Sequence, residues 1–298
     1  MTLEENEIRR EAWKYYFVLL AWPAYLFFLP FAFARLGWWT VLLMVFPGVW
    51  LFTWVGYLMH ECWHKYVPGI PHGVFYNVFS WMLVTDPQIY RLLHGHHHAE
   101  VNTFADREFH PLGKPNSLWL WRLHNALEIV TGVAFLVIAG LLQVPRLERY
   151  KDKYRISSTL LSVLMWAVIY GGIGWASVAV FKVRAGRAVV AYLLQFWLGS
   201  VVLHHSQLVE HGNLFVAGDW SVRNVKTRNL RFRTLSEKIF LFLTHHDSRE
   251  HVLHHTQVKI YARPFPGRIP LPENAIVISL RQYFKILGDM LAGRESGY

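Results

Sequence analysis

Apolar runs long enough to cross a bilayer alternate with short polar connections along this chain. Residues 13–34 and 38–59 are almost wholly apolar, and each matches the roughly 20 residues with which a helix spans a hydrocarbon core. Only the turn from Arg35 to Gly37 separates these runs, so we expect a hairpin of two membrane helices. The basic residues around Lys14 place the N-terminus in the cytoplasm, and the hairpin therefore returns to the cytoplasmic face at His60.

Three further apolar runs follow, at residues 126–143, 158–181 and 185–203. If all three crossed the membrane, the histidine-rich segments before and after them would lie on opposite sides. The connection at 144–157 carries five basic residues and that at 182–187 carries three, and the more basic loop belongs in the cytoplasm. We therefore expect residues 158–181 and 185–203 to form a second hairpin, with residues 126–143 lying in the interface or re-entering.

These patterns predict an all-α integral membrane protein built as one domain over its whole length. We expect about four transmembrane helices in two hairpins, or six if a short apolar run such as residues 73–84 also crosses. Residues 60–125 and 204–298 would form a cytoplasmic, histidine-rich cap that includes interfacial helices. Residues 236–243 have the pattern of a short amphipathic helix, and the proline-rich tail after Ala262 is expected to wrap the surface.

Composition supports a membrane location and limits the chemistry. Hydrophobic residues make up 53% of the chain and charged residues 17%, below the roughly 25% charged of soluble domains. The net charge of +10 fits cytoplasmic loops that face anionic lipid, and we expect no nucleic-acid partner. The single cysteine, Cys62, excludes an intramolecular disulfide and a cysteine-ligated iron–sulfur cluster, so redox chemistry would need electrons from a partner.

The histidines are grouped in a way that favours metal binding. His94, His97 and His98 have helical spacing and share one face, and the same spacing recurs at His251, His254 and His255. Two more, at positions 60 and 64, stand one helical turn apart, and another, at position 211, lies between the clusters. Eight or nine imidazoles could enclose more than one transition metal, since neutral imidazole suits zinc, copper, iron and nickel.

Other interpretations of these histidines remain open. His60, Glu61 and His64 match the helical zinc motif of metalloproteases, in which the glutamate is the general base. Such a site would explain only two of the nine histidines. A haem-binding electron carrier and a zinc or copper protein with a structural or transport role are further alternatives. His96 points away from its neighbours, and we expect three isolated histidines to be ordinary surface or core residues: His72, His110 and His124.

The motifs HECWH, HGHHH and HVLHH together resemble the three histidine boxes of the integral-membrane fatty acid desaturase and hydroxylase superfamily, which includes alkane hydroxylase-like members. The segment HHHAEVNTFADREF is similar to the one that follows the second box there. The likeness runs from His60 to about Pro272. It implies a non-haem di-iron centre bound mainly by imidazole, with molecular oxygen as co-substrate, electrons from an external donor and a hydrophobic channel for a long chain.

The resemblance assigns nine metal ligands in this sequence: His60, His64, His94, His97, His98, His211, His251, His254 and His255. His211 matches only by context, because Glu210-His211-Gly212 resembles an element of alkane hydroxylases. Four other histidines compete for its role: His204, His205, His245 and His246. Ligating histidines usually donate their second N–H to a carboxylate or carbonyl. Six carboxylates near the boxes are candidates for this contact: Glu61, Asp86, Glu100, Asp106, Glu210 and Asp247.

The function that follows is oxidation of a C–H bond in a long lipid or hydrocarbon, with fatty acyl desaturation expected first. Hydroxylation of a fatty acid, alkane or terpenoid at the same site is the alternative, and geometry at the substrate carbon decides between the two outcomes. Thr256-Gln257-Val258 replaces the hydrophobic-proline continuation common after the third box of acyl-lipid desaturases, so the exact substrate stays open. The resemblance implies a donor of ferredoxin, rubredoxin or cytochrome b5 type. We expect a basic stretch to contact that donor or an anionic head group, or to be an ordinary cytoplasmic loop: Arg223, Lys226, Arg228, Arg231 and Arg233.

Overall fold

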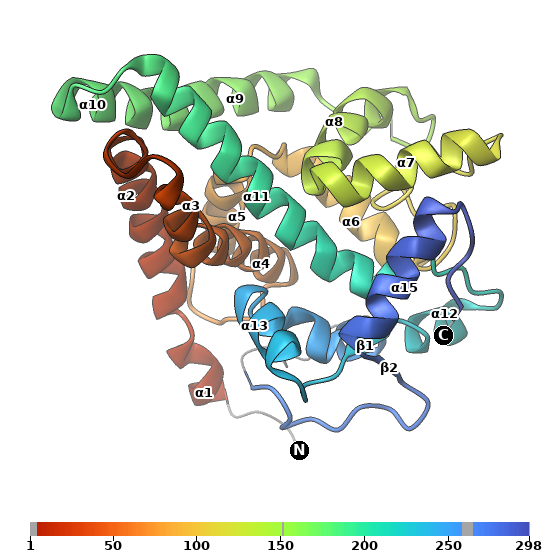
Figure 1. The fold of residues 1–298 in the computed structure, drawn as a ribbon. Helices are drawn as coiled ribbons and strands as arrows, with labels where there is room; N and C mark the ends of the chain where they lie inside the picture. Colours follow the sequence, from red (N-terminus) through yellow and green to blue (C-terminus); the bar gives the residue numbers. More distant parts are fainter. Residues whose placement is uncertain (1–4, 151, 258–264, 298) are drawn as a thin grey trace. The chain divides into compact units, whose positions relative to one another are not determined.

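The computed structural model describes residues 5–150, 152–257 and 265–297 (Figure 1). Contacts within the chain divide these residues into two compact units. The hairpin unit comprises Glu5–Gln88 and Arg155–Ser200, and the histidine unit comprises Ile89–Tyr154 and the chain from Val201 onward. The boundaries fall inside two helices, α6 (Pro87–Glu100) and α11 (Ala185–His211), so each of these helices contributes to both units.

The hairpin unit is entirely helical over the residues described. Its helices are α1 (Glu5–Arg10), α2 (Trp13–Leu36), α3 (Thr40–Leu43), α4 (Trp50–His64), α5 (His72–Met82), α9 (Ile156–Trp166), α10 (Gly172–Phe181) and the first part of α11. Short 3-10 or π segments at Gly37–Trp39, Met44–Val49 and Ala167–Gly171 connect some of them. The predicted short run at residues 73–84 forms α5, which packs along α4.

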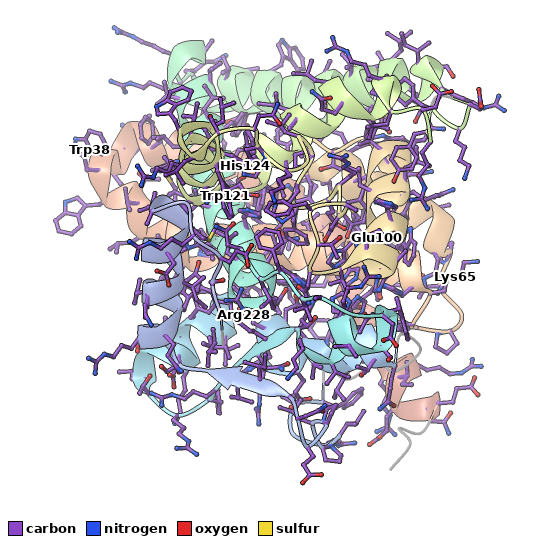
Figure 2. All side chains as sticks on the ribbon, turned by 90° about the vertical axis from the view of Figure 1, so that its right-hand side faces the viewer. Trp38, Lys65, Glu100, Trp121, His124 and Arg228 are labelled. Carbon is purple, nitrogen blue, oxygen red and sulfur yellow. The ribbon has the colours of Figure 1, made fainter. Side chains whose placement is uncertain are left out.

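The first hairpin reverses at Gly37, whose φ of +56° lies in the left-handed region that favours glycine. The α2 and α4 helices then run antiparallel, because Tyr15 contacts Glu61 while Trp22 contacts Phe52. At the turn, the Trp38 side chain is 83% exposed and stands clear of the ribbon (Figure 2). Exposed tryptophan at the end of an apolar hairpin is typical of a membrane–water interface.

The second hairpin joins the α9–α10 stretch to α11. The chain turns at Lys182, which adopts a left-handed conformation, and Tyr192 of α11 then lies against Gly174 of α10. Three helical stretches are long and apolar enough to cross a membrane: Glu5–His64, Ile156–Phe181 and Ala185–His211. Since the first of these folds back on itself at Gly37, they accommodate the predicted hairpins. The prediction of an all-α membrane protein is confirmed.

The histidine unit combines shorter helices with a two-stranded sheet. It contains most of α6, then α7 (Leu118–Thr131), α8 (Val133–Gln143), a 3-10 turn at Val144–Arg146, the end of α11, α12 (Trp220–Val225), β1 (Arg228–Leu230), α13 (Leu235–Leu243), a 3-10 turn at Asp247–Arg249, α14 (His251–Thr256), β2 (Ile276–Ile278) and α15 (Leu280–Leu291). The α13 helix confirms the predicted amphipathic segment. Gly132, with a φ of +62°, divides the run at 126–143 into α7 and α8, and neither helix is long enough to span.

The prediction for the tail is wrong over the residues described. The chain forms β2, which pairs in parallel with β1 in the register Arg228 to Ile276, and then α15, which packs against α7 (Figure 1). Ser279 begins α15 with a capping box to Gln282. Tyr283, Ile286 and Met290 of this helix are buried against Leu208 of α11 in the main apolar core of the unit. Residues 258–264 of the tail lie outside the described residues.

Candidate metal centre

The α6 helix presents the second histidine box to the interior of the histidine unit. The helix begins at Pro87, a residue suited to the first helical position, and Asp86 accepts a hydrogen bond from the Gln88 backbone at 2.7 Å. The helix continues without a break to Glu100, so His94, His97 and His98 project from consecutive turns of one face. All three are buried or half-buried.

Four imidazoles in the histidine unit come together from three helices. This imidazole cluster consists of His97 on α6, His211 at the end of α11, and His251 and His255 on α14. The His97 ring centroid lies 4.8 Å from that of His211 and 4.9 Å from that of His255. The Nε2 atom of His251 lies 3.3 Å from that of His211 and 3.1 Å from that of His255. The fold thus brings His97 and His255, which are about 160 positions apart in the sequence, into one buried cluster.

The orientation of these rings fits metal ligation. The Nδ1 of His97 lies 2.7 Å from an Asp106 oxygen, and the Nδ1 of His211 lies 3.0 Å from Oδ1 of Asn102. Each Nδ1 therefore donates a hydrogen, which leaves the Nε2 atoms with lone pairs. Nitrogens bound at about 2.0–2.1 Å to one metal stand roughly 3.0–3.4 Å apart when adjacent. The Nε2 separations within the cluster fall in this range.

Burial favours the neutral form of two α14 imidazoles, His251 and His255, and a metal ligand must be neutral. Burial lowers the pKa of His251 and His255 well below the usual histidine value, and the neighbouring imidazoles lower it further. His97 differs. Burial lowers its pKa, but the charge of Asp106 and the hydrogen bond to it outweigh burial and raise the pKa. The carboxylate thus increases the basicity of the one ring that it contacts.

The remaining box histidines of this unit form a second group. The Nε2 atoms of His94 and His98 are 3.2 Å apart, and the ring of His254 lies 4.7 Å from that of His98 between centroids. A carboxylate again holds the far side of one ring, because Glu108 lies 2.9 Å from the Nδ1 of His94. The arrangement repeats that of the imidazole cluster with other residues.

The first box ends α4 in the hairpin unit. The Nε2 atoms of His60 and His64 are 3.0 Å apart, the separation of adjacent ligands on one metal. The helix stops directly after them, where Lys65 adopts a left-handed conformation. Glu61 faces another way, since its buried carboxylate accepts a hydrogen bond of 2.7 Å from the Tyr15 hydroxyl. This contact gives Glu61 a structural role in the hairpin and weakens the metalloprotease interpretation.

The competitors of His211 lie elsewhere. His204 faces Glu128, with its Nε2 at 3.9 Å from a carboxylate oxygen. Both ring nitrogens of His205 are engaged, by the Tyr283 hydroxyl at 2.7 Å and the Ile129 carbonyl at 3.0 Å. His246 contacts the Phe232 ring. Of these histidines, His211 is the one that the structure places in a metal-binding group.

The carboxylates expected near the boxes divide into two sets. Asp106 contacts His97, and two others approach His251: Asp247 lies 3.7 Å from its Nδ1 and Glu210 lies 3.3 Å from its Nε2. By contrast, Asp86 accepts a hydrogen bond of 2.6 Å from Thr159 in the hairpin unit, and Glu100 pairs with Arg223 at 3.3 Å. These last two have structural partners.

Two functional contacts escaped the sequence reasoning. Glu108 was not among the candidate carboxylates, although it lies two residues after Asp106 in the segment that follows the second box. Its backbone N–H donates to Asp106 at 3.1 Å, and this turn directs both carboxylates toward α6 histidines. Asn102, in a left-handed conformation, reaches His211 from the same segment. The polar spacing of AEVNTFADRE was the available signal.

Most of the basic stretch contacts other parts of the protein itself. Arg228 is fully buried and donates to the Ser296 hydroxyl at 3.1 Å and to the Gly212 carbonyl. Arg228 is labelled in Figure 2. Arg231 pairs with Glu237 at 2.6 Å, as Arg223 does with Glu100. Three of the five cations therefore stabilise the histidine unit.

Comparison of the chain with models of protein families gives a match. The model of the family described as fatty acid desaturase matches residues 36–262, about three quarters of the chain. The chain belongs to the fatty acid desaturase family. The predicted resemblance is confirmed, and the family implies a membrane oxidoreductase of the desaturase or hydroxylase kind. Comparison with curated proteins gives no match, and comparison with solved structures gives none either.

Proposed function

We propose that this desaturase-family protein oxidises a C–H bond of a long acyl chain at a di-iron centre, and that the product is a double bond. The observation that carries the proposal is the imidazole cluster. Its Nε2 atoms converge at ligand distances, while protein oxygens hold the Nδ1 atoms of His97 and His211 from behind. A cluster built in this way is suited to hold a metal.

The residues fit two metals bound mainly by imidazole. In the histidine unit, one set of ligands would come from the imidazole cluster and another from His94, His98 and His254. The family pattern assigns His60 and His64 as further ligands, for a total of nine histidines. Bound iron with molecular oxygen would supply the oxidising power that removes hydrogen from an unactivated C–H bond. We propose that these histidines lie on the cytoplasmic side, as the basic loops favour.

The electron balance requires a partner. Removal of two hydrogens from the substrate supplies half of the electrons that reduce O2 to water, and an external donor supplies the other half. We propose a donor of ferredoxin, rubredoxin or cytochrome b5 type, because a chain with one buried cysteine has no thiolate set for an iron–sulfur cluster of its own. Arg223 and Arg231 are paired with carboxylates and Arg228 is fully buried, so these three cations form a poor docking surface for this donor.

Hydroxylation by the same centre is the second candidate, and a specific contact favours it. The Glu210-His211-Gly212 segment resembles an element of alkane hydroxylases, and His211 lies in the imidazole cluster. The residues would bind and orient the same kind of substrate, with addition of oxygen replacing removal of the second hydrogen. The position of the substrate carbon decides between the two outcomes.

The test is mass spectrometry of lipids from cells that express the protein. Desaturation predicts products lighter by two hydrogens, and hydroxylation predicts products heavier by one oxygen. Expression of His97→Ala, which lacks one ligand of the imidazole cluster, is the control and should give neither product. A lipid profile identical to that of the control would contradict both functions.

A further inference from the structure

A buried carboxylate, that of Glu210, faces the imidazole cluster. Glu210 is 1% exposed, and its neighbours within the described residues include the Ser248 side chain and a second carboxylate, Asp247, so no cation of the protein compensates it. Leaving a buried ionised group unpaired costs several kcal/mol, by order of magnitude, so such a group usually has a ligand or a counter-charge. The Nε2 of His251 lies 3.3 Å from a Glu210 oxygen.

The Glu210 carboxylate lies beside the nitrogens that are candidate metal ligands. Glu210, His211 and His251 each offer one ligand atom, and these atoms lie within 4.8 Å of one another. The Nε2 of His251 is 3.3 Å from both the Glu210 oxygen and the His211 Nε2. A carboxylate oxygen bound to a metal at about 2.0–2.2 Å would stand at a similar distance from an adjacent imidazole nitrogen.

We propose that Glu210 supplies a carboxylate oxygen to the metal held by the imidazole cluster, which makes this a mixed carboxylate–imidazole site. The inference rests on the proposed metal-dependent function and goes beyond the all-histidine ligand set that the family pattern assigns to this chain. It also gives this buried acid a counter-charge, because the metal would supply the positive charge that its protein neighbours lack.

Charge gives a physical reason for the mixed ligand set. Four neutral imidazoles leave the full positive charge of a divalent ion in a buried place, where an uncompensated charge is costly. Asp106 compensates only through the ring of His97, whereas Glu210 would do so by direct contact. Asp247, which lies 3.7 Å from the Nδ1 of His251, then orients that ring from its other side.

The experiment is a metal titration of the full-length protein, purified in detergent and stripped of metal. Cobalt(II) is the probe, because its visible absorption reports the ligands as well as the occupancy. The variant is Glu210→Gln, which keeps the shape and removes the charge. The matched control is Glu128→Gln in the same unit, since Glu128 is 2% exposed and contacts His124 and His204, which lie outside the metal-binding groups.

We expect Glu210→Gln to bind cobalt at one site at least about tenfold more weakly and with altered visible bands, and Glu128→Gln to match the wild type. Equal affinity and an unchanged spectrum for Glu210→Gln would overturn the inference. If that variant does not fold, Glu210→Asp takes its place, and an altered spectrum supports ligation while an unchanged one overturns it. Failure of the wild type itself to bind two metals would contradict the proposed function instead.

Discussion

Two of the buried clusters of histidine and carboxylate in the histidine unit are arranged in different ways. In the imidazole cluster, the Nε2 atoms of His211, His251 and His255 converge, and Asp106 stands behind the ring of His97. In the second, which we call the Glu128 cluster (His110, His124, Glu128 and His204), the carboxylate is central. Its oxygens lie 3.5 Å from the Nδ1 of His124 and 3.9 Å from the Nε2 of His204.

The difference shows that a metal site needs imidazole nitrogens that converge on one point, and that the number of histidines alone does not separate it from an ion pair. A carboxylate behind an imidazole strengthens the free nitrogen as a ligand. The Glu128 carboxylate instead lies between the rings of His124 and His204, and their positive charge compensates it. Burial raises the pKa of Glu128, but the charges and hydrogen bond of its histidine neighbours, His124 first, lower it below 4.5 overall. The Glu128 cluster is therefore a structural ion pair.

The largest expected effect is a loss of bound metal when a histidine of the imidazole cluster, but not of the Glu128 cluster, is replaced. His255→Ala removes a ligand from the imidazole cluster, so the purified protein should lose one metal per chain. Activity should fall by more than the roughly 10- to 100-fold that loss of an outer partner costs. His124→Ala should keep both metals. Elemental analysis of the two variants makes the comparison, and equal metal loss from both would mean that the Glu128 cluster also binds an ion.

A smaller effect is expected from the carboxylate behind the ring. Asp106→Asn keeps the size of the side chain but removes the charge that the His97 Nδ1 contacts at 2.7 Å. Metal affinity should fall by about 10- to 100-fold. The control is Glu100→Gln, because Glu100 pairs with Arg223 and its side chain is 31% exposed. Competition with a metal chelator measures both, and an unchanged affinity for Asp106→Asn would remove the distinction drawn between the two clusters.

The parts of this site that local geometry determines could be predicted from the sequence. Helical spacing places His94, His97 and His98 on one face, and the same holds for the α14 histidines. The hairpins follow from the length of the apolar runs and from the short turn at Gly37. These features depend on residues close together in the chain.

Contacts between distant segments could not be predicted. His124 and His204 meet over a separation of 80 positions, and no periodicity indicates that Glu128 lies between them. The basic stretch looked like a docking surface because its partners, Glu100 and Ser296 among them, are brought to it by the fold. The prolines before α15 favoured an irregular tail, so this helix was not predicted. The residues of its capping box, Ser279 and Gln282, do have the spacing of a helix start in the sequence.

The smallest expected effect is on the free energy of unfolding, and it tests whether His124 and Glu128 form an ion pair. Burial lowers the pKa of His124, but the charge and hydrogen bond of Glu128 raise it above 6.5 overall. The stabilisation from His124 is therefore complete below the unfolded value near 6.5 and is lost as the pH rises through the folded pKa. That from Glu128 is complete above 4.5 and is lost as the pH falls through its lowered folded pKa.

Both contributions are present together between about pH 4.5 and 6.5, so the metal-free protein should lose most stability there when Glu128 is replaced by Gln. The expected loss is about 1–3 kcal/mol, the cost of leaving a buried partner unsatisfied. Thermal unfolding of the wild type and Glu128→Gln across this pH range measures it. Glu100→Gln, in a partly exposed pair, should show a smaller difference without this maximum. A stability difference that does not change with pH would mean that Glu128 and His124 are both neutral in the folded protein, and that the second cluster is a hydrogen-bonded group and not an ion pair.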